Sequence, residues 1–191
     1  MKKCMTSLRA SLGLLALFSI LLGGVYPLAI TVISKILFTD AASGSLLQKD
    51  GKIIGSSLLG QEFTQNNYFW GRLSATSPAY NAASSSGSNY SPANPKLLEA
   101  ANARIEALQK ADPKNKAQIP VELITASASG LDPHISLLAA EYQMGRVAKA
   151  RGLQQDVVHA LIIEHILPQS QFFGSPYVSV LELNLALDEL K

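Results

Sequence analysis

The sequence has almost no cysteine and few charged residues. Cys4 is the only cysteine among 191 residues, so the chain cannot form an internal disulfide, and no cysteine–histidine spacing indicates a zinc site. The chain after Cys4 has no cysteine. This is compatible with a bacterial periplasm, where disulfides can form but are not required. Charged residues make up 16% of the chain without forming a basic cluster, which argues against nucleic acid as a partner.

Acidic residues are absent from the first 35 positions, which carry Lys2, Lys3, Arg9 and Lys35. The rest of the chain holds 12 basic and 14 acidic residues, so the net charge of +2 arises from the N-terminal stretch alone. We interpret this excess as a signal of membrane topology rather than of an anionic ligand.

Residues 10–34 contain no charge and read ASLGLLALFSILLGGVYPLAITVIS. At 1.5 Å per residue this run spans the ~30 Å hydrocarbon core of a bilayer. Its 13 Leu, Ile, Val and Phe residues offer about −6 kcal/mol of insertion free energy. The alternative, a cleaved signal peptide, has a shorter apolar region of about 7 to 15 residues. We therefore expect residues 10–34 to be an uncleaved transmembrane helix.

The charges around this helix predict its orientation. Cytoplasmic flanks of membrane helices are enriched in Lys and Arg, which places residues 1–9 in the cytoplasm and residues 36–191 in the periplasm. The chain is thus expected to be a single-pass protein of the bacterial inner membrane, in contact with lipid. Small residues permit close helix packing, although Gly and Pro are also simply common in membrane helices; the candidates for packing are Ser19, Gly23, Gly24 and Pro27.

The periodicity of residues 36–191 predicts one α+β (mixed α/β) domain. Asp50-Gly51 indicates a hairpin turn, and the uncharged stretch 73–95 indicates a long loop. Asn94 and Pro95 supply an N-cap and a first helical residue. We expect a helix from 95 to before Pro113, a helix over 133–151 that Gly152 closes at its C-terminal cap, and a helix over 154–167. We also expect an extended segment over 68–75, a strand over 120–127, and a strand followed by a short helix over 177–190.

The stretch ASASGLDPHIS, residues 126–136, allows two interpretations. Gly130 permits a turn, Asp132 can cap a helix that begins at Pro133, and His134 then lies in the first helical turn. Alternatively, Ser129, Asp132 and His134 form a hydrolase site. A serine nucleophile needs a positioned base and an oxyanion hole, and no Gly-x-Ser-x-Gly elbow is present. We favour the turn and helix cap.

Metal binding is not predicted. His159 and His165 are six residues apart on one predicted helix, which is not the spacing of a metal-binding pair. The basic residues near the end of the preceding helix, Arg146 and Arg151 among them, suit its dipole. Contact with a ligand or partner is the alternative interpretation for these residues.

Several blocks resemble one family over nearly the whole chain. They are VELITASASGLDPHIS, QMGRVAKARGL, VSVLELNLALDEL, GGVYPLAITVI, YFWGRLSAT and SSSGSNYSPANPKL. In the order in which they occur along the chain, they are similar to the C subunit of the Kdp potassium-transporting P-type ATPase. The resemblance implies a non-catalytic accessory subunit. Our candidates for contact with a partner are Gln143, Arg146 and Arg151.

The resemblance also implies partners and a transported ion. The family assembles with a channel-like K⁺-translocating subunit, an ATP-hydrolysing P-type subunit and a small fourth subunit, and the complex imports K⁺. Its C subunit is described as a catalytic chaperone that raises the ATP affinity of the hydrolysing subunit. Nucleotide contact is associated with a Ser-Gly-rich loop, which corresponds here to Ser84, Ser85, Ser86, Gly87, Ser88 and Asn89.

The residues themselves argue against direct ATP binding. The loop reads Ser86-Gly87-Ser88-Asn89 where the family usually has a second glycine, and the loss of that glycine reduces the backbone freedom that a phosphate cradle uses. No Walker-type Gly-x-x-x-x-Gly-Lys is present, and the predicted topology places the loop outside the cytoplasm. We therefore expect a structural role, with a periplasmic hydrolase anchored in the membrane and a free-standing binding module as the competing hypotheses.

Overall fold

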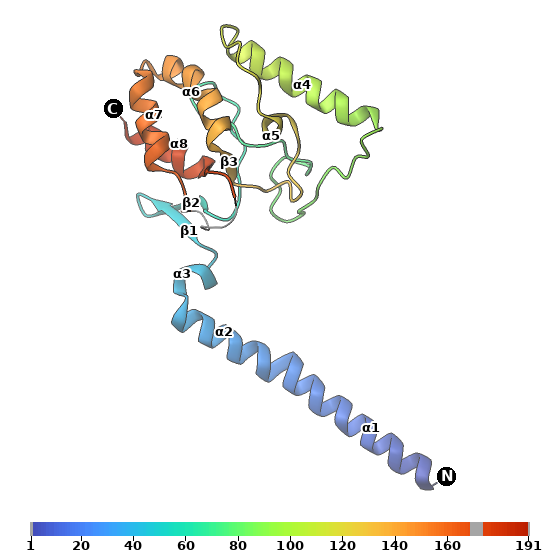
Figure 1. Cartoon of the computed structure of the whole chain (residues 1–191). Coiled ribbons are helices and arrows are strands. Elements are labelled where there is room, and N and C mark those ends of the chain that lie inside the picture. Colours follow the sequence, from blue (N-terminus) through green and yellow to red (C-terminus); the bar gives the residue numbers. More distant parts are fainter. Residues whose placement is uncertain (1, 169–173, 191) are drawn as a thin grey trace. The chain divides into compact units, whose positions relative to one another are not determined.

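The computed structural model describes residues 2–168 and 174–190 and divides the chain into two compact units, residues 1–46 and 47–191. The first unit is helical (Figure 1). It comprises α1 (Lys2–Ile20), a π-helical turn η1 (Leu21–Val25), α2 (Tyr26–Leu37) and the single turn α3 (Thr39–Ala42). An apolar helical stretch of 33 residues, Met5–Leu37, has a mean hydropathy of 2.1 and is nowhere buried, so it is long and apolar enough to cross a membrane.

The π-turn lies at the small residues of the apolar helix. In a regular helix, the ring of Pro27 would clash with the carbonyl of Gly23, four residues earlier. The wider turn at Leu21–Val25, in which the Tyr26 N–H donates to Leu21 O five residues back, precedes that proline. Two side-chain hydroxyls bond within the helix, because Ser11 donates to Ser7 O and Thr31 donates to Pro27 O, both at 2.7 Å. The segment therefore hides these polar groups from lipid.

The second unit is a mixture of helices and two small sheets, which confirms the predicted α+β class (Figure 1). Antiparallel β3 and β4 pair Ile135 with Val178. The elements in chain order are β1 (Leu46–Lys49), β2 (Lys52–Ser56), α4 (Pro95–Ala111), α5 (Val121–Ile124), β3 (His134–Ser136), α6 (Leu137–Arg151), α7 (Gln155–Glu164), β4 (Tyr177–Ser179) and α8 (Val180–Glu189).

Local sequence signals explain several boundaries. Asp50 and Gly51 connect β1 to β2 with positive φ angles of 52° and 74°, as a type I′ hairpin turn requires. The Asn94 side chain caps α4 by accepting the Lys96 N–H. Gly152, with φ of 68°, ends α6 in the left-handed conformation. These three predictions are confirmed.

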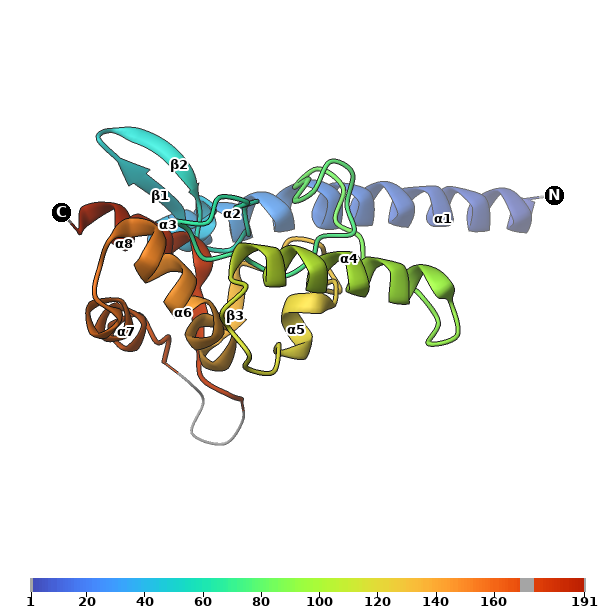
Figure 2. The ribbon, with the colours of Figure 1, turned by 90° about the horizontal axis from the view of Figure 1, so that it is seen from above.

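The core lies where α6, α7 and α8 pack together, in the orange and red part of the domain in both views (Figure 2). Its fully buried side chains include Phe69, Leu123 and Ile135, together with Val147, Val158, Ile162, Val178, Leu183 and Leu187. Helix α4 (yellow-green) contributes the buried Leu108 and the partly buried Ala111, both near its C-terminal end, to this core. The outer domain thus has one packed end and one helix with an unburied flank.

The strand predicted over residues 120–127 is wrong. Residues 120–127 contain the short helix α5, in which Val121 is exposed and Leu123 is buried, and only Ala126 bridges to Leu73. The aromatic segment 68–75 has no strand neighbour beyond that bridge. The aromatic segment, which we expected to be extended, makes its backbone hydrogen bonds with side chains instead of with a strand.

Side-chain amides supply those hydrogen bonds. The Phe69 N–H donates to Asn184 Oδ1 at 2.8 Å, and Asn184 Nδ2 donates back to Phe69 O at 3.0 Å. Gln143 makes the same pair of hydrogen bonds with Trp70. Its Oε1 accepts the Trp70 N–H, and its Nε2 donates to Trp70 O. Both amides are 1% exposed. Side chains of α6 and α8 therefore make the backbone hydrogen bonds that a neighbouring strand would make in a sheet.

The predicted helix start at Pro133 is also wrong. The Pro133 carbonyl accepts the Val180 N–H at 2.9 Å, and residues 134–136 pair with β4 instead of continuing into a helix. Helix α6 begins at Leu137, and its cap is Ser136, whose hydroxyl accepts the Ala139 N–H. Asp132 is not a helix cap. Its carboxylate instead accepts the His134 N–H at 3.0 Å, which closes a local turn.

We predict that Asn184→Leu lowers the free energy of unfolding by about 3 kcal/mol, because it leaves a buried N–H and a buried C=O of Phe69 unpaired. Asn102→Leu, on an exposed position of α4, is the matched control and should cost less than about 0.5 kcal/mol. Urea unfolding followed by circular dichroism measures both values. Equal midpoints for the two variants would contradict the role of Asn184.

Candidate functional site

The structure brings together two segments that the sequence marked separately, the Ser-Gly-rich loop and the turn after α5. Ser86 N–H donates to Ser129 O at 2.9 Å, and the Ser85 hydroxyl donates to the same carbonyl at 3.0 Å. Farther along, Ser74 Oγ donates to Gly130 O at 2.7 Å. The long loop is therefore docked along residues 126–130 rather than standing free in solvent.

Two glycines face the opposite backbone at this junction. A Cβ at Gly87 would lie 2.7 Å from Ala128 O, and a Cβ at Gly130 would lie 2.7 Å from Ser86 O. Gly130 also has a φ of 68°, a region that other residues rarely adopt. Each segment thus needs its glycine so that the other can approach. The close approach of Ala128 therefore accounts for a glycine at position 87, and no bound phosphate is needed to explain it.

The inner half of the loop is organised by hydroxyl groups. Ser74 Oγ accepts the Tyr80 N–H at 2.9 Å, and Thr76 Oγ1 accepts the Asn81 N–H at 3.0 Å. The Tyr80 hydroxyl donates to Arg72 O at 2.7 Å. Burial raises the pKa of Tyr80 to about 12, because the phenolate would lose its hydration. The tyrosine therefore acts as a neutral hydrogen-bond donor that fixes the loop.

The residues proposed for nucleotide contact carry no positive charge. Ser84, Ser85, Ser86 and Asn89 are exposed, whereas Gly87 and Ser88 are half-buried. Asn89 adopts a positive φ of 50°, which Asn tolerates better than most residues. Without a cation among residues 84–89, the loop offers only hydroxyl and amide groups to a ligand. Nucleotide contact at this loop stays a prediction.

The hydrolase interpretation lacks its central contact. Ser129 Oγ accepts the Leu131 N–H at 3.1 Å, and among the described residues no hydrogen bond joins Ser129 to His134. The His134 ring instead meets Tyr177 edge-on at 4.9 Å, with its Nδ1 3.8 Å from Asp132 Oδ1. Asp132 Oδ2 accepts from Arg72 Nη1 at 3.1 Å. These groups hold a turn and do not present an activated nucleophile.

Of the three predicted partner contacts, two point inward. Arg146 is 4% exposed and donates to Asn66 O, Tyr68 O and Gln143 Oε1. Burial lowers the pKa of Arg146 to about 10. Gln143 is equally buried, so the expectation that these two meet a partner is wrong. Arg151 stacks on Tyr68 and pairs with Asp188 at 2.7 Å, and a contact of Arg151 with a partner stays a prediction.

The residues proposed for packing in the membrane lie on the apolar helix. Ser19 is in α1, the two glycines are in the π-turn, and Pro27 is the second residue of α2. A Cβ at Gly23 or Gly24 would meet nothing within 4 Å in this chain. The backbone at the π-turn is thus open to another helix, and packing of such a helix against it stays a prediction.

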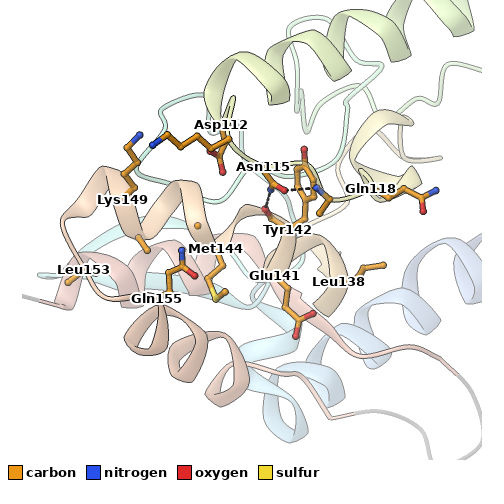
Figure 3. A pocket seen from close by; sticks show the side chains of 14 residues that line it. Asp112, Asn115, Gln118, Leu138, Glu141, Tyr142, Met144, Lys149, Leu153 and Gln155 are labelled. Atoms are coloured by element: carbon orange, nitrogen blue, oxygen red, sulfur yellow. Dashed lines mark hydrogen bonds between the residues drawn. The ribbon is translucent and has the colours of Figure 1, made fainter.

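An open depression of about 730 Å³ lies between α6 and the segment after α4 (Figure 3). Asn115 shapes its wall by donating to Tyr142 O at 2.9 Å and accepting the Ala117 N–H. Asp112 and Glu141 line it together with Lys114 and Lys149. Burial, with a further effect of Asp112, raises the pKa of Tyr142. Because both charge signs are present, the depression does not select one kind of ion.

The described residues contain no group of three or more His, Cys, Asp or Glu that could hold a metal ion. Sequence reasoning missed Asn184, Tyr80 and Arg104, which hold the loop and the aromatic segment. Arg104 gave no distinguishing signal, because α4 carries several charged residues, and only the structure shows that its Nη2 donates to Gly71 O at 2.8 Å. Asn184 gave no local signal, because its partner lies 115 positions away.

Comparison with known proteins assigns the chain to a family. The family model described as "K+-transporting ATPase, c chain" matches residues 8–189. Three similar proteins are each named potassium-transporting ATPase KdpC subunit. The protein from Herpetosiphon aurantiacus is 54% identical over 97% of both chains. The protein from Ralstonia nicotianae is 55% identical over 96% of this chain and 91% of its own, and that from Dechloromonas aromatica is 56% identical over 97% and 98%. This chain therefore belongs to the family of the c chain of the K⁺-transporting ATPase.

Proposed function

We propose that this chain is a non-catalytic accessory subunit of a high-affinity, ATP-driven K⁺ import complex. The observation that carries the proposal is the match over residues 8–189, which includes both the apolar helix and the outer domain. Its companions are a channel-like K⁺-translocating subunit, a P-type ATP-hydrolysing subunit and a small fourth subunit. K⁺ is the ion moved by the complex, and this chain needs no cofactor of its own.

The chain sits in the inner membrane with its first nine residues in the cytoplasm. Lys2, Lys3 and Arg9 precede the apolar helix, and only Lys35 follows closely. The positive-inside rule then assigns residues 36–191 to the periplasm. The hydrolysing domain of a P-type pump works on the other side, where ATP is found, so this subunit acts on ATP use from a distance.

The outer domain serves as a lid at the outer mouth of the channel-like subunit, while the apolar helix packs beside it. Its effect on ATP affinity is allosteric, with a coupling free energy of about 1–3 kcal/mol between distant sites. The docked loop supports this role, because its one glycine, Gly87, faces the backbone of Ala128 and residues 84–89 carry no cation for phosphate. Catalytic chaperoning is thus a property of the assembled complex.

The competing hypotheses make different predictions about companions. A membrane-anchored hydrolase or a free-standing binding module works alone, whereas a subunit is recovered with large membrane proteins. The contacts of Ser129 and His134 favour the subunit, since neither activates the other.

Purification in mild detergent tests the assembly. The wild-type chain should bring the channel-like and hydrolysing subunits with it, and Gly23→Leu should reduce their recovery several-fold by crowding the open π-turn. Gly13→Leu, in the same helix and equally unobstructed within this chain, is the control and should behave as the wild type. Undiminished recovery with Gly23→Leu would exclude the π-turn as the contact, and a chain purified without companions would refute the subunit role.

Cysteine labelling tests the topology. In intact cells, a membrane-impermeant maleimide should label Ser84→Cys, built in a Cys4→Ser background, because Ser84 is exposed in the outer domain. The native Cys4 is the control and should react only after permeabilisation, since the N-terminal segment is cytoplasmic in our proposal. The opposite pattern of labelling would place the outer domain inside the cell.

A further inference from the structure

A cavity of about 550 Å³ lies between α4 and the docked loop, and no step of the proposed function uses it. Its volume is within the range of small-molecule sites. One wall is the unburied flank of α4 and the other is formed by the end of α5 and the loop. The walls are largely aliphatic and include Leu97, Ala100, Ala103, Ala107, Ile124 and Ala126.

Arg104 is the only charged residue that lines this cavity. Its Nε donates to Leu123 O at 3.1 Å, and its Nη2 donates to Gly71 O at 2.8 Å. Its guanidinium lies 4.9 Å from the centre of the Trp70 ring. These contacts hold the cation in one place at the cavity wall, and they leave Nη1 without a hydrogen-bond partner among the described residues.

The charge of Arg104 is not neutralised by the protein. Among the described residues, no carboxylate lies within 4 Å of its guanidinium. A second cation, Arg146, lies over the same Trp70 ring at 4.4 Å. Burial lowers the pKa of Arg104, because the charged form loses part of its hydration. Charges that are largely removed from water are normally paired, so a mostly aliphatic cavity whose wall carries the half-buried, unpaired cation of Arg104 is suited to a ligand that supplies the missing anion.

We propose that the cavity binds a small aliphatic carboxylate, with its head at Arg104 and its chain along the alanines of α4. A single cation matches a single anionic group. A polyphosphate would leave further charges unpaired in apolar surroundings, which is unfavourable. Ser74 and Ser88, at the loop wall, offer hydroxyl groups near the same cavity. The inference is independent of the proposed function, because it rests only on this cavity.

Trp70 provides the readout, since it is the only tryptophan in the chain and lies beneath Arg104. The full chain, in lipid nanodiscs whose belt protein lacks tryptophan, is titrated with octanoate while its emission is followed. We expect a saturable change. Octanol, which lacks the charge, and acetate, which lacks the chain, should each bind at least about tenfold more weakly, because a hydrogen bond to a charged group contributes about 1.5–3 kcal/mol.

Two variants close the cavity from opposite walls without altering Arg104. Ala100→Phe fills it from α4, and Ser88→Phe fills it from the loop. Each should abolish the octanoate response, whereas Asn102→Phe, an exposed position on α4 that does not line the cavity, should preserve it. Thermal unfolding in the absence of octanoate shows whether each variant folds. If one of them does not fold, the octanoate response of the other tests the proposal.

Three outcomes would overturn the proposal. The first is the absence of a saturable response in the wild-type chain. The second is a response in folded Ala100→Phe and Ser88→Phe equal to that of the wild type. The third is equal binding of octanol and octanoate, which would make the cavity an apolar groove in which Arg104 has no part.

Discussion

Two buried side-chain amides hold the aromatic segment on which the rest of the outer domain depends. Asn184 of α8 and Gln143 of α6 each satisfy both backbone groups of one residue, Phe69 and Trp70 respectively. Because an unpaired buried backbone group costs about 1–3 kcal/mol, neither helix can move away from this segment without loss. The two helices and the segment between β2 and α4 therefore form one packed unit, although only short sheets are present.

The position of Trp70 determines where the long loop that follows it begins. Arg146 and Arg104 lie over its ring, and Arg104 reaches Gly71 O, so the start of the long loop is fixed from α4 as well. From there the loop docks along residues 126–130 through paired hydrogen bonds and glycines. A serine-rich, uncharged segment thus becomes a wall of a cavity. The role that we propose, in which the subunit acts by shape and contact, needs this kind of rigidity.

Sequence reasoning succeeded where the signal was local. The apolar span, the Asp50-Gly51 turn, the Asn94 cap and the Gly152 helix end all follow from a few adjacent residues, and the structure has them. It failed where distant partners decide. The strand expected over 120–127 contains the short helix α5, and the helix expected from Pro133 begins later because residues 134–136 pair with β4. The extended segment 68–75 has its backbone hydrogen bonds to Gln143 and Asn184, which its own sequence does not reveal. Likewise, the helical periodicity of α4 does not reveal that Arg104 contacts the Trp70 ring and the carbonyl of Gly71.

Hydrogen exchange of the Phe69 and Trp70 amides tests the central claim most directly. If Asn184 and Gln143 hold them, both amides should exchange only through global unfolding, as slowly as the core amides of α6. Protection lost as quickly as at exposed loop positions such as Thr64 would contradict the account, because the aromatic segment would then open on its own.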